Sequence, residues 1–79
     1  MLTTTTRMYA VPAVYMWDAR EIATVHILDT LGPYDFSVRP TLTSPSLNNR
    51  TGEVERFVRV TGNDRVHGAM LSRFEWAGE

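Results

Sequence analysis

The chain has 79 residues, no cysteine and a formal net charge of −1. A chain of this length forms one domain, and the absence of cysteine excludes disulfides and thiolate metal sites. The balanced charge excludes a strong overall field that would attract nucleic acid, anionic lipid or acidic partners.

A domain this small buries only roughly 60% of the surface that its unfolded chain exposes, so it commonly needs a disulfide, a metal or self-association for stability. Because disulfides are excluded, we keep homo-oligomerisation as an alternative state of the protein.

All eight basic residues are arginine, although lysine serves equally well on a solvated surface. We interpret this bias as the codon usage of a GC-rich genome, such as that of a high-GC bacterium or its phage. Residues 8–17 are apolar but far shorter than the roughly 20 residues of a membrane-spanning helix. The N-terminus also lacks the charged start and the cleavage site of a signal peptide, which predicts a cytoplasmic protein.

Residues 1–6 are low in complexity and are predicted to be a flexible leader, which leaves residues 7–79 as a single globular domain. Ten threonines and eight valines tilt the composition toward strands, because β-branched side chains crowd a helix but fit a pleated surface. We therefore expect a β-rich domain.

Residues 9–17 alternate as a strand, with Tyr9 and Val11 on one face and Ala10 and Val14 on the other. The proline at position 12 lacks an amide donor, which predicts an edge or bulged strand. Two apolar faces on such a strand indicate either a closed barrel or a cover by another molecule.

Residues 18–31 allow two interpretations. Asp18 and Glu21 form a capping box, and Gly32 followed by Pro33 is a helix stop, which together favour a helix. The apolar residues scatter around the helical axis, however, and the run is rich in β-branched side chains. We favour a strand and keep the helix as the alternative.

Residues 36–43 alternate apolar and polar side chains, which predicts a half-buried strand, and Pro40 places it at an edge or a bend. Residues 44–52 contain serine, proline, two asparagines and a glycine, and are expected to form the longest irregular and mobile loop.

The C-terminal third is predicted to be a β-hairpin. Residues 53–61 and 65–76 are strand-like runs joined by residues 62–64, whose sequence Gly-Asn-Asp is a turn signal. A three-residue loop gathers the valines on one face and sets Glu53 opposite Arg73. The second face then holds apolar side chains within a charged rim, among them Phe57, Arg59, His67, Leu71 and Arg73.

The predicted fold is all-β: a small domain of about five strands, barrel-like or an open sandwich, with this C-terminal β-hairpin. The alternative is an α+β fold with one helix at residues 18–31. Both architectures host many unrelated functions, so the function must be argued from surfaces.

The sequence carries no pattern typical of a catalytic or metal site, and we expect neither enzymatic activity nor a cofactor. His26 and His67 lack the cysteines and the His-Glu-x-x-His spacing of a zinc site. Gly52, Gly62 and Gly68 stand alone and do not form a phosphate-binding loop.

We interpret the chain as a small non-enzymatic protein-interaction module, of a phage or accessory kind, that binds a host protein or a second copy of itself. An apolar centre with an arginine rim is enriched at binding surfaces. The predicted partner-binding residues are therefore those of the second hairpin face: Phe57, Arg59, His67, Leu71 and Arg73. The alternative is a weak nucleic-acid-binding β-barrel that uses four arginines, Arg56, Arg59, Arg65 and Arg73.

Overall fold

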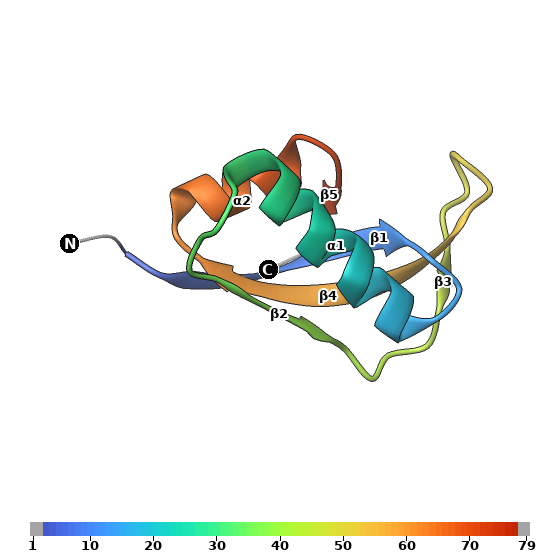
Figure 1. Ribbon diagram of the computed structural model, residues 1–79. Coiled ribbons are helices and arrows are strands. Elements are labelled where there is room, and N and C mark those ends of the chain that lie inside the picture. Colours follow the sequence, from blue (N-terminus) through green and yellow to red (C-terminus); the bar gives the residue numbers. More distant parts are fainter. Residues whose placement is uncertain (1–2, 78–79) are drawn as a thin grey trace.

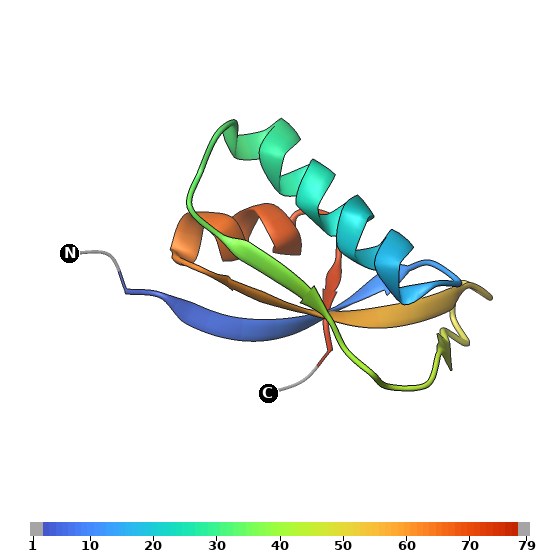
Figure 2. The same cartoon turned by 60° about the horizontal axis from the view of Figure 1, so that its bottom comes forward.

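Antiparallel strands form a sheet that carries two helices on one of its faces, in a computed structural model that describes residues 3–77 (Figure 1). In chain order the elements are β1 (Thr5–Pro12), α1 (Met16–Leu31), β2 (Ser37–Pro40), β3 (Ser46–Leu47), β4 (Val54–Gly62), α2 (Asp64–Leu71) and β5 (Glu75–Trp76). The strand order is β2-β4-β1-β5, and the short β3 pairs with the start of β4. Within residues 3–77, the opposite face of the sheet carries no helix (Figure 2).

Without β3 the elements follow the order β-α-β-β-α-β, which is a split β-α-β arrangement. β4 lies between β1 and β2, and β1 lies between β4 and β5. The fold is therefore α+β, and the all-β prediction is wrong. The sheet is also open, so the predicted barrel is wrong as well, and the α+β alternative had one of the two helices.

The first helix forms because its buried side chains recur every fourth residue. Ala19, Ala23 and Ile27 are fully buried and make one stripe against the sheet. The helix ends at Gly32, whose φ of 72° lets its amide donate to the Leu28 carbonyl at 2.8 Å. The strand predicted for this segment is therefore wrong. The helical periodicity was hard to recognise in the sequence because the other apolar residues of α1 lie outside the buried stripe.

The second half of the predicted hairpin is also a helix. Asn63 caps α2: its side-chain oxygen accepts from the amides of Arg65 at 3.0 Å and Val66 at 3.3 Å. Its Nδ2 group donates to the Tyr34 hydroxyl at 2.8 Å. The sequence Gly-Asn-Asp is compatible with the start of a helix as well as with a turn. Because Asn63 caps a helix here, the hairpin prediction is wrong.

β1 is a central strand, because β4 and β5 pair with its two sides. The predicted edge position is wrong: Tyr9 and Val11 are fully buried, and Pro12 ends the strand. β1 begins at Thr5, so the end of the predicted leader pairs with β4. Residues 1–2 of that leader lie outside the described residues.

Two predicted strands are confirmed in their central parts. β4 occupies most of the first hairpin strand, although its neighbour is β1 instead of residues 65–76. β2 lies within the strand predicted at residues 36–43, and Pro40 lies on an edge strand as expected. The long loop of residues 44–52 contains β3 and a turn.

One apolar cluster fills the space between the helices and the sheet. His26 of α1 donates from Nε2 to the Ala69 carbonyl at 2.8 Å, and its ring meets Phe74 edge-on with centroids 5.4 Å apart, which ties α1 to α2. The cluster draws on the sheet, on the α1 stripe and on the α2 region: Tyr9, Val11, Ala19, Ala23, Ile27, Val38, Val58, Val60, Val66, Met70 and Phe74.

Gly62 stands where β4 meets α2, and no side chain fits there. A Cβ at this position would lie 2.7 Å from the Val66 Cβ. We predict that Gly62→Ala lowers the free energy of unfolding by about 1–3 kcal/mol, the usual cost of overpacking. Chemical denaturation measures the change.

Gly68→Ala is the matched control, because a Cβ there meets nothing within 4 Å. Alanine is favoured over glycine inside a helix by about 1 kcal/mol, so this variant should keep or raise the denaturation midpoint. A Gly62→Ala midpoint equal to that of the wild type would contradict the close packing of Gly62 on Val66.

Candidate functional site

The structure separates the residues that were predicted to bind a partner. Phe57 and Arg59 lie on the face of the sheet opposite to the helices, which we call the open face. The residues of β4 that alternate with them are buried under the helices. Leu71 is exposed on α2, and Arg73 follows α2 with its guanidinium against an aromatic ring. These residues would share one face only if residues 65–76 were a strand.

His67 belongs to the core, where it is 2% exposed, and not to a partner surface. The Tyr9 hydroxyl lies 2.6 Å from its Nδ1, and the Thr5 carbonyl oxygen lies 3.0 Å from its Nε2. Because a carbonyl only accepts, Nε2 carries the proton and Nδ1 accepts from Tyr9. Burial raises the pKa of Tyr9, while the charge of Arg7 acts in the opposite direction. The pair is therefore a structural element.

The four arginines predicted to bind nucleic acid do not line one groove. Arg56 donates from Nε to the Val14 carbonyl at 2.8 Å and from Nη1 to the Thr43 carbonyl at 3.2 Å. These two hydrogen bonds connect the segment before α1 with the segment after β2. Arg59 is on the open face, Arg65 is in the first turn of α2, and the fourth arginine follows α2.

The open face of the sheet carries an arginine pair that sequence reasoning missed. Arg39 of β2 lies directly opposite Arg59 of β4, and Met8 of β1 lies on the other side of Arg59. Neither guanidinium makes a hydrogen bond or ion pair with residues 3–77. Like charges in directly opposed positions destabilise a sheet, so this pair is a place where an anion would be stabilising.

Exposed apolar residues belong to segments that lie at the end of the molecule where α1 begins, namely the start of α1, the segment after β2, β3 and the start of β4 (Figure 1). Leu42 is 91% exposed, Tyr15 is 67% exposed and Trp17 is 62% exposed. The two hydrogen bonds of Arg56 hold together the segments that carry these side chains. We call this surface the apolar end, and it comprises Val14, Tyr15, Trp17, Leu42, Leu47 and Val54.

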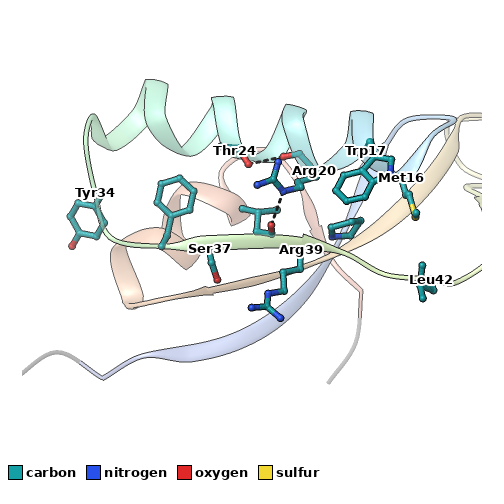
Figure 3. A pocket seen from close by; sticks show the side chains of 11 residues that line it. Met16, Trp17, Arg20, Thr24, Tyr34, Ser37, Arg39 and Leu42 are labelled. Carbon is teal, nitrogen blue, oxygen red and sulfur yellow. Dashed lines mark hydrogen bonds between the residues drawn. The ribbon is translucent and has the colours of Figure 1, made fainter.

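A groove of about 930 Å³ runs between α1 and β2 and meets the apolar end at Trp17 and Leu42 (Figure 3). Arg20 of α1 lies in this groove and donates from Nε to the Val38 carbonyl at 3.1 Å. The groove therefore combines apolar side chains with a positioned guanidinium.

Sequence reasoning missed the apolar end because it placed Tyr15 and Trp17 in a strand with a buried apolar face. In a helix, Trp17 lies about 200° around the axis from Ala19, the first residue of the buried stripe. The helix alternative began at residue 18, so it did not include Trp17 and could not predict its exposure. Nothing in the sequence around Leu42 signals its exposure.

Within residues 3–77, no three histidine, aspartate or glutamate side chains cluster as metal ligands, and no helix is long and apolar enough to cross a membrane. Comparisons with models of known protein families, with characterised proteins and with solved structures gave no match. The function is therefore inferred from the surface of the molecule.

We predict that Tyr9→Phe lowers the free energy of unfolding by about 1–3 kcal/mol, because it leaves the buried His67 Nδ1 without a donor. Tyr15→Phe, at an exposed position, is the matched control and should change stability by less than about 0.5 kcal/mol. Urea denaturation of both variants measures the difference. Equal effects would contradict the buried hydrogen bond.

The buried hydrogen bond between Tyr9 and His67 also predicts that the protein loses stability at alkaline pH. The pKa of Tyr9 is raised in the folded state above its ordinary value of 10.0, so the unfolded state releases this proton first as the pH rises. Its stabilising contribution is complete below that value and is lost as the pH rises through the folded-state pKa. Tyr9→Phe should lose less stability than the wild type over this range, measured by denaturation at increasing pH.

Proposed function

We propose that the protein is a non-enzymatic protein-binding module whose partner, a different protein, contacts the apolar end. The observation that carries the proposal is the exposure of Tyr15, Trp17 and Leu42 together at one end of the molecule. Exposed apolar patches on small domains mark interaction sites, and tryptophan and tyrosine are enriched among the residues that dominate binding energy. A cytoplasmic location is part of this proposal.

The apolar end is also held in shape before any partner arrives. Arg56 binds the carbonyls of Val14 and Thr43, and the Thr41 hydroxyl donates to the Phe57 carbonyl at 3.0 Å. A surface that is ordered in advance loses less conformational entropy on binding. These hydrogen bonds support the use of the irregular segments as a binding surface.

A second candidate function is the binding of single-stranded nucleic acid on the open face. The specific observation is that Arg39 and Arg59, whose guanidinium groups have no partner within residues 3–77, lie on the same face as the half-buried Phe57. A phosphate between the two arginines would relieve their repulsion while a base stacks on the ring, as on other stacking platforms.

The acidic side chains of the open face cancel part of this charge, because Glu55 keeps its negative charge when it accepts a hydrogen bond from a neutral amide. Glu75 forms an ion pair with Arg50, and Glu55 accepts a hydrogen bond from Asn48 Nδ2 at 3.1 Å. Two cations are therefore a small site, since stronger binders neutralise many more phosphates. This is why protein binding at the apolar end is the leading proposal.

Fluorescence anisotropy with a labelled oligothymidylate of about 16 nucleotides tests the second candidate. Neutralising two phosphates predicts an affinity that falls about sevenfold between about 50 and about 200 mM salt. Arg59→Gln should halve the salt slope, whereas the control Arg65→Gln, on α2, should keep it. Absence of binding at the lower salt concentration would contradict this candidate.

Site-directed photocrosslinking in the cells that make the protein tests the leading proposal. Benzoylphenylalanine at Leu42 should give one discrete adduct, and the same group at the control position Asp29, exposed near the far end of α1, should give none. Trp17→Ser should reduce the Leu42 adduct by at least about tenfold, as expected for a residue that dominates binding.

The folding of each variant is verified by circular dichroism. Identical adducts at both positions, or a Leu42 adduct that survives Trp17→Ser, would contradict the proposal. An adduct at twice the mass of the chain would instead identify a second copy as the partner.

A further inference from the structure

β2 is the outer strand of the sheet, and its free edge lines the groove beside α1 (Figure 3). The Thr41 amide donates to the Phe57 carbonyl of β4 at 3.2 Å. Along an antiparallel strand, residues that bond to the neighbouring strand alternate with residues whose backbone groups point away from it, so Pro40 and Val38 turn their backbone groups outward. The Val38 carbonyl accepts from Arg20, while its amide has no partner among residues 3–77.

Two arginines flank this free edge, and the exposed Asp35 precedes β2 without lining the groove. Arg20 is fixed by its Nε bond to Val38, which leaves its terminal Nη groups available for a carboxylate. Arg39 leaves β2 on the side away from α1 (Figure 3). Among the described residues that line the groove, none is aspartate or glutamate. The edge therefore favours a negatively charged ligand.

The length of the groove favours an extended ligand. It follows the chain from Tyr34 to Leu42, and at about 3.3 Å per residue this distance is about 26 Å. Apolar side chains lie toward both ends, with Tyr34 and Phe36 at one and Trp17 and Leu42 at the other. A peptide segment of about eight residues matches this length.

We propose that the groove binds an extended acidic segment of the partner protein, laid along β2 as an additional strand. A main-chain carbonyl of the segment accepts the Val38 amide, its carboxylates meet Arg20 and Arg39, and its apolar side chains cover Trp17 and Leu42. The proposal rests on the proposed function, because Trp17 and Leu42 belong to the apolar end, and it names the class of partner.

A second copy of β2 is a poor occupant of the same edge. Pro40 has no amide to donate and Arg20 already occupies the Val38 carbonyl, so any added strand bonds to the backbone of β2 mainly through the Val38 amide, and charge decides between the occupants. A symmetric pair would bring the arginines of both copies together, which is unfavourable. An acidic segment of another protein neutralises them instead.

The probe for the test is a fluorescein-labelled pool of peptides of about eight residues, in which aspartate or glutamate alternates with varied apolar residues. The control pool has lysine at every acidic position. We expect the acidic pool to bind the full chain in fluorescence anisotropy, and to slow the hydrogen exchange of the Val38 amide in NMR spectra. The lysine pool should not bind.

Arg20→Gln keeps an N–H donor for the Val38 carbonyl but removes the charge, and it should weaken binding of the acidic pool at least about tenfold. Arg65→Gln, an exposed arginine at the start of α2, is the matched control and should leave the affinity unchanged. Circular dichroism verifies that both variants are folded.

Three results would overturn strand addition at β2: no binding of the acidic pool, equal binding of the lysine pool, or binding that neither protects the Val38 amide nor depends on Arg20. If the Leu42 photocrosslink still forms in that case, the protein-binding function stands and only the class of partner is wrong. If the photocrosslink fails as well, both proposals are overturned.

Discussion

Ala19, Ala23 and Ile27 form the narrow contact through which α1 packs on the sheet, and much of the exposed surface follows from it. A stripe of one residue per turn buries little of the helix, so other apolar side chains of α1, Trp17 among them, lie outside the core. Because α2 packs on the same side, no helix of the described part of the chain covers the opposite face of the sheet (Figure 2). β2 lies at one end of the strand order, so one of its edges has no neighbouring strand among the described residues.

The arginines of the chain divide into positioned and free ones, which a charge count does not distinguish. Arg56 and Arg20 each donate to backbone carbonyls and hold irregular or edge segments in place. Arg39 and Arg59 have no such partners within residues 3–77 and keep their full capacity for an anion. The binding surfaces therefore depend on local geometry, since the net charge of the chain is close to zero.

Local signals at the ends of the helices predicted more of the fold than composition did. The sequence at Gly32 predicts the end of a helix, whereas the high content of threonine and valine favours strands. Composition was the poorer guide, because tertiary packing overrides such propensities. The capping role of Asn63 was hidden because the same residues form turns. The pairing of β1 with β4 joins distant parts of the chain, and no local pattern encodes it.

The position of a site residue could be predicted only where the helix or strand that carries it was predicted correctly. Alternation along β4 correctly separated Phe57 and Arg59 from the buried valines, because that segment is a strand. His67 was misplaced, since a helix turns it toward Tyr9 whereas a strand would expose it. The apolar end needed the correct helix first, because its members come from two segments that meet only in the folded chain.

Cross-saturation NMR on the complex with the captured partner is the most direct test of the binding surface. If the partner contacts the apolar end and the adjoining groove, saturation should transfer to the amides of residues 13–20 and 36–47 and spare those around Phe57 on β4. Transfer confined to the open face, with residues 13–20 unaffected, would contradict binding at the apolar end.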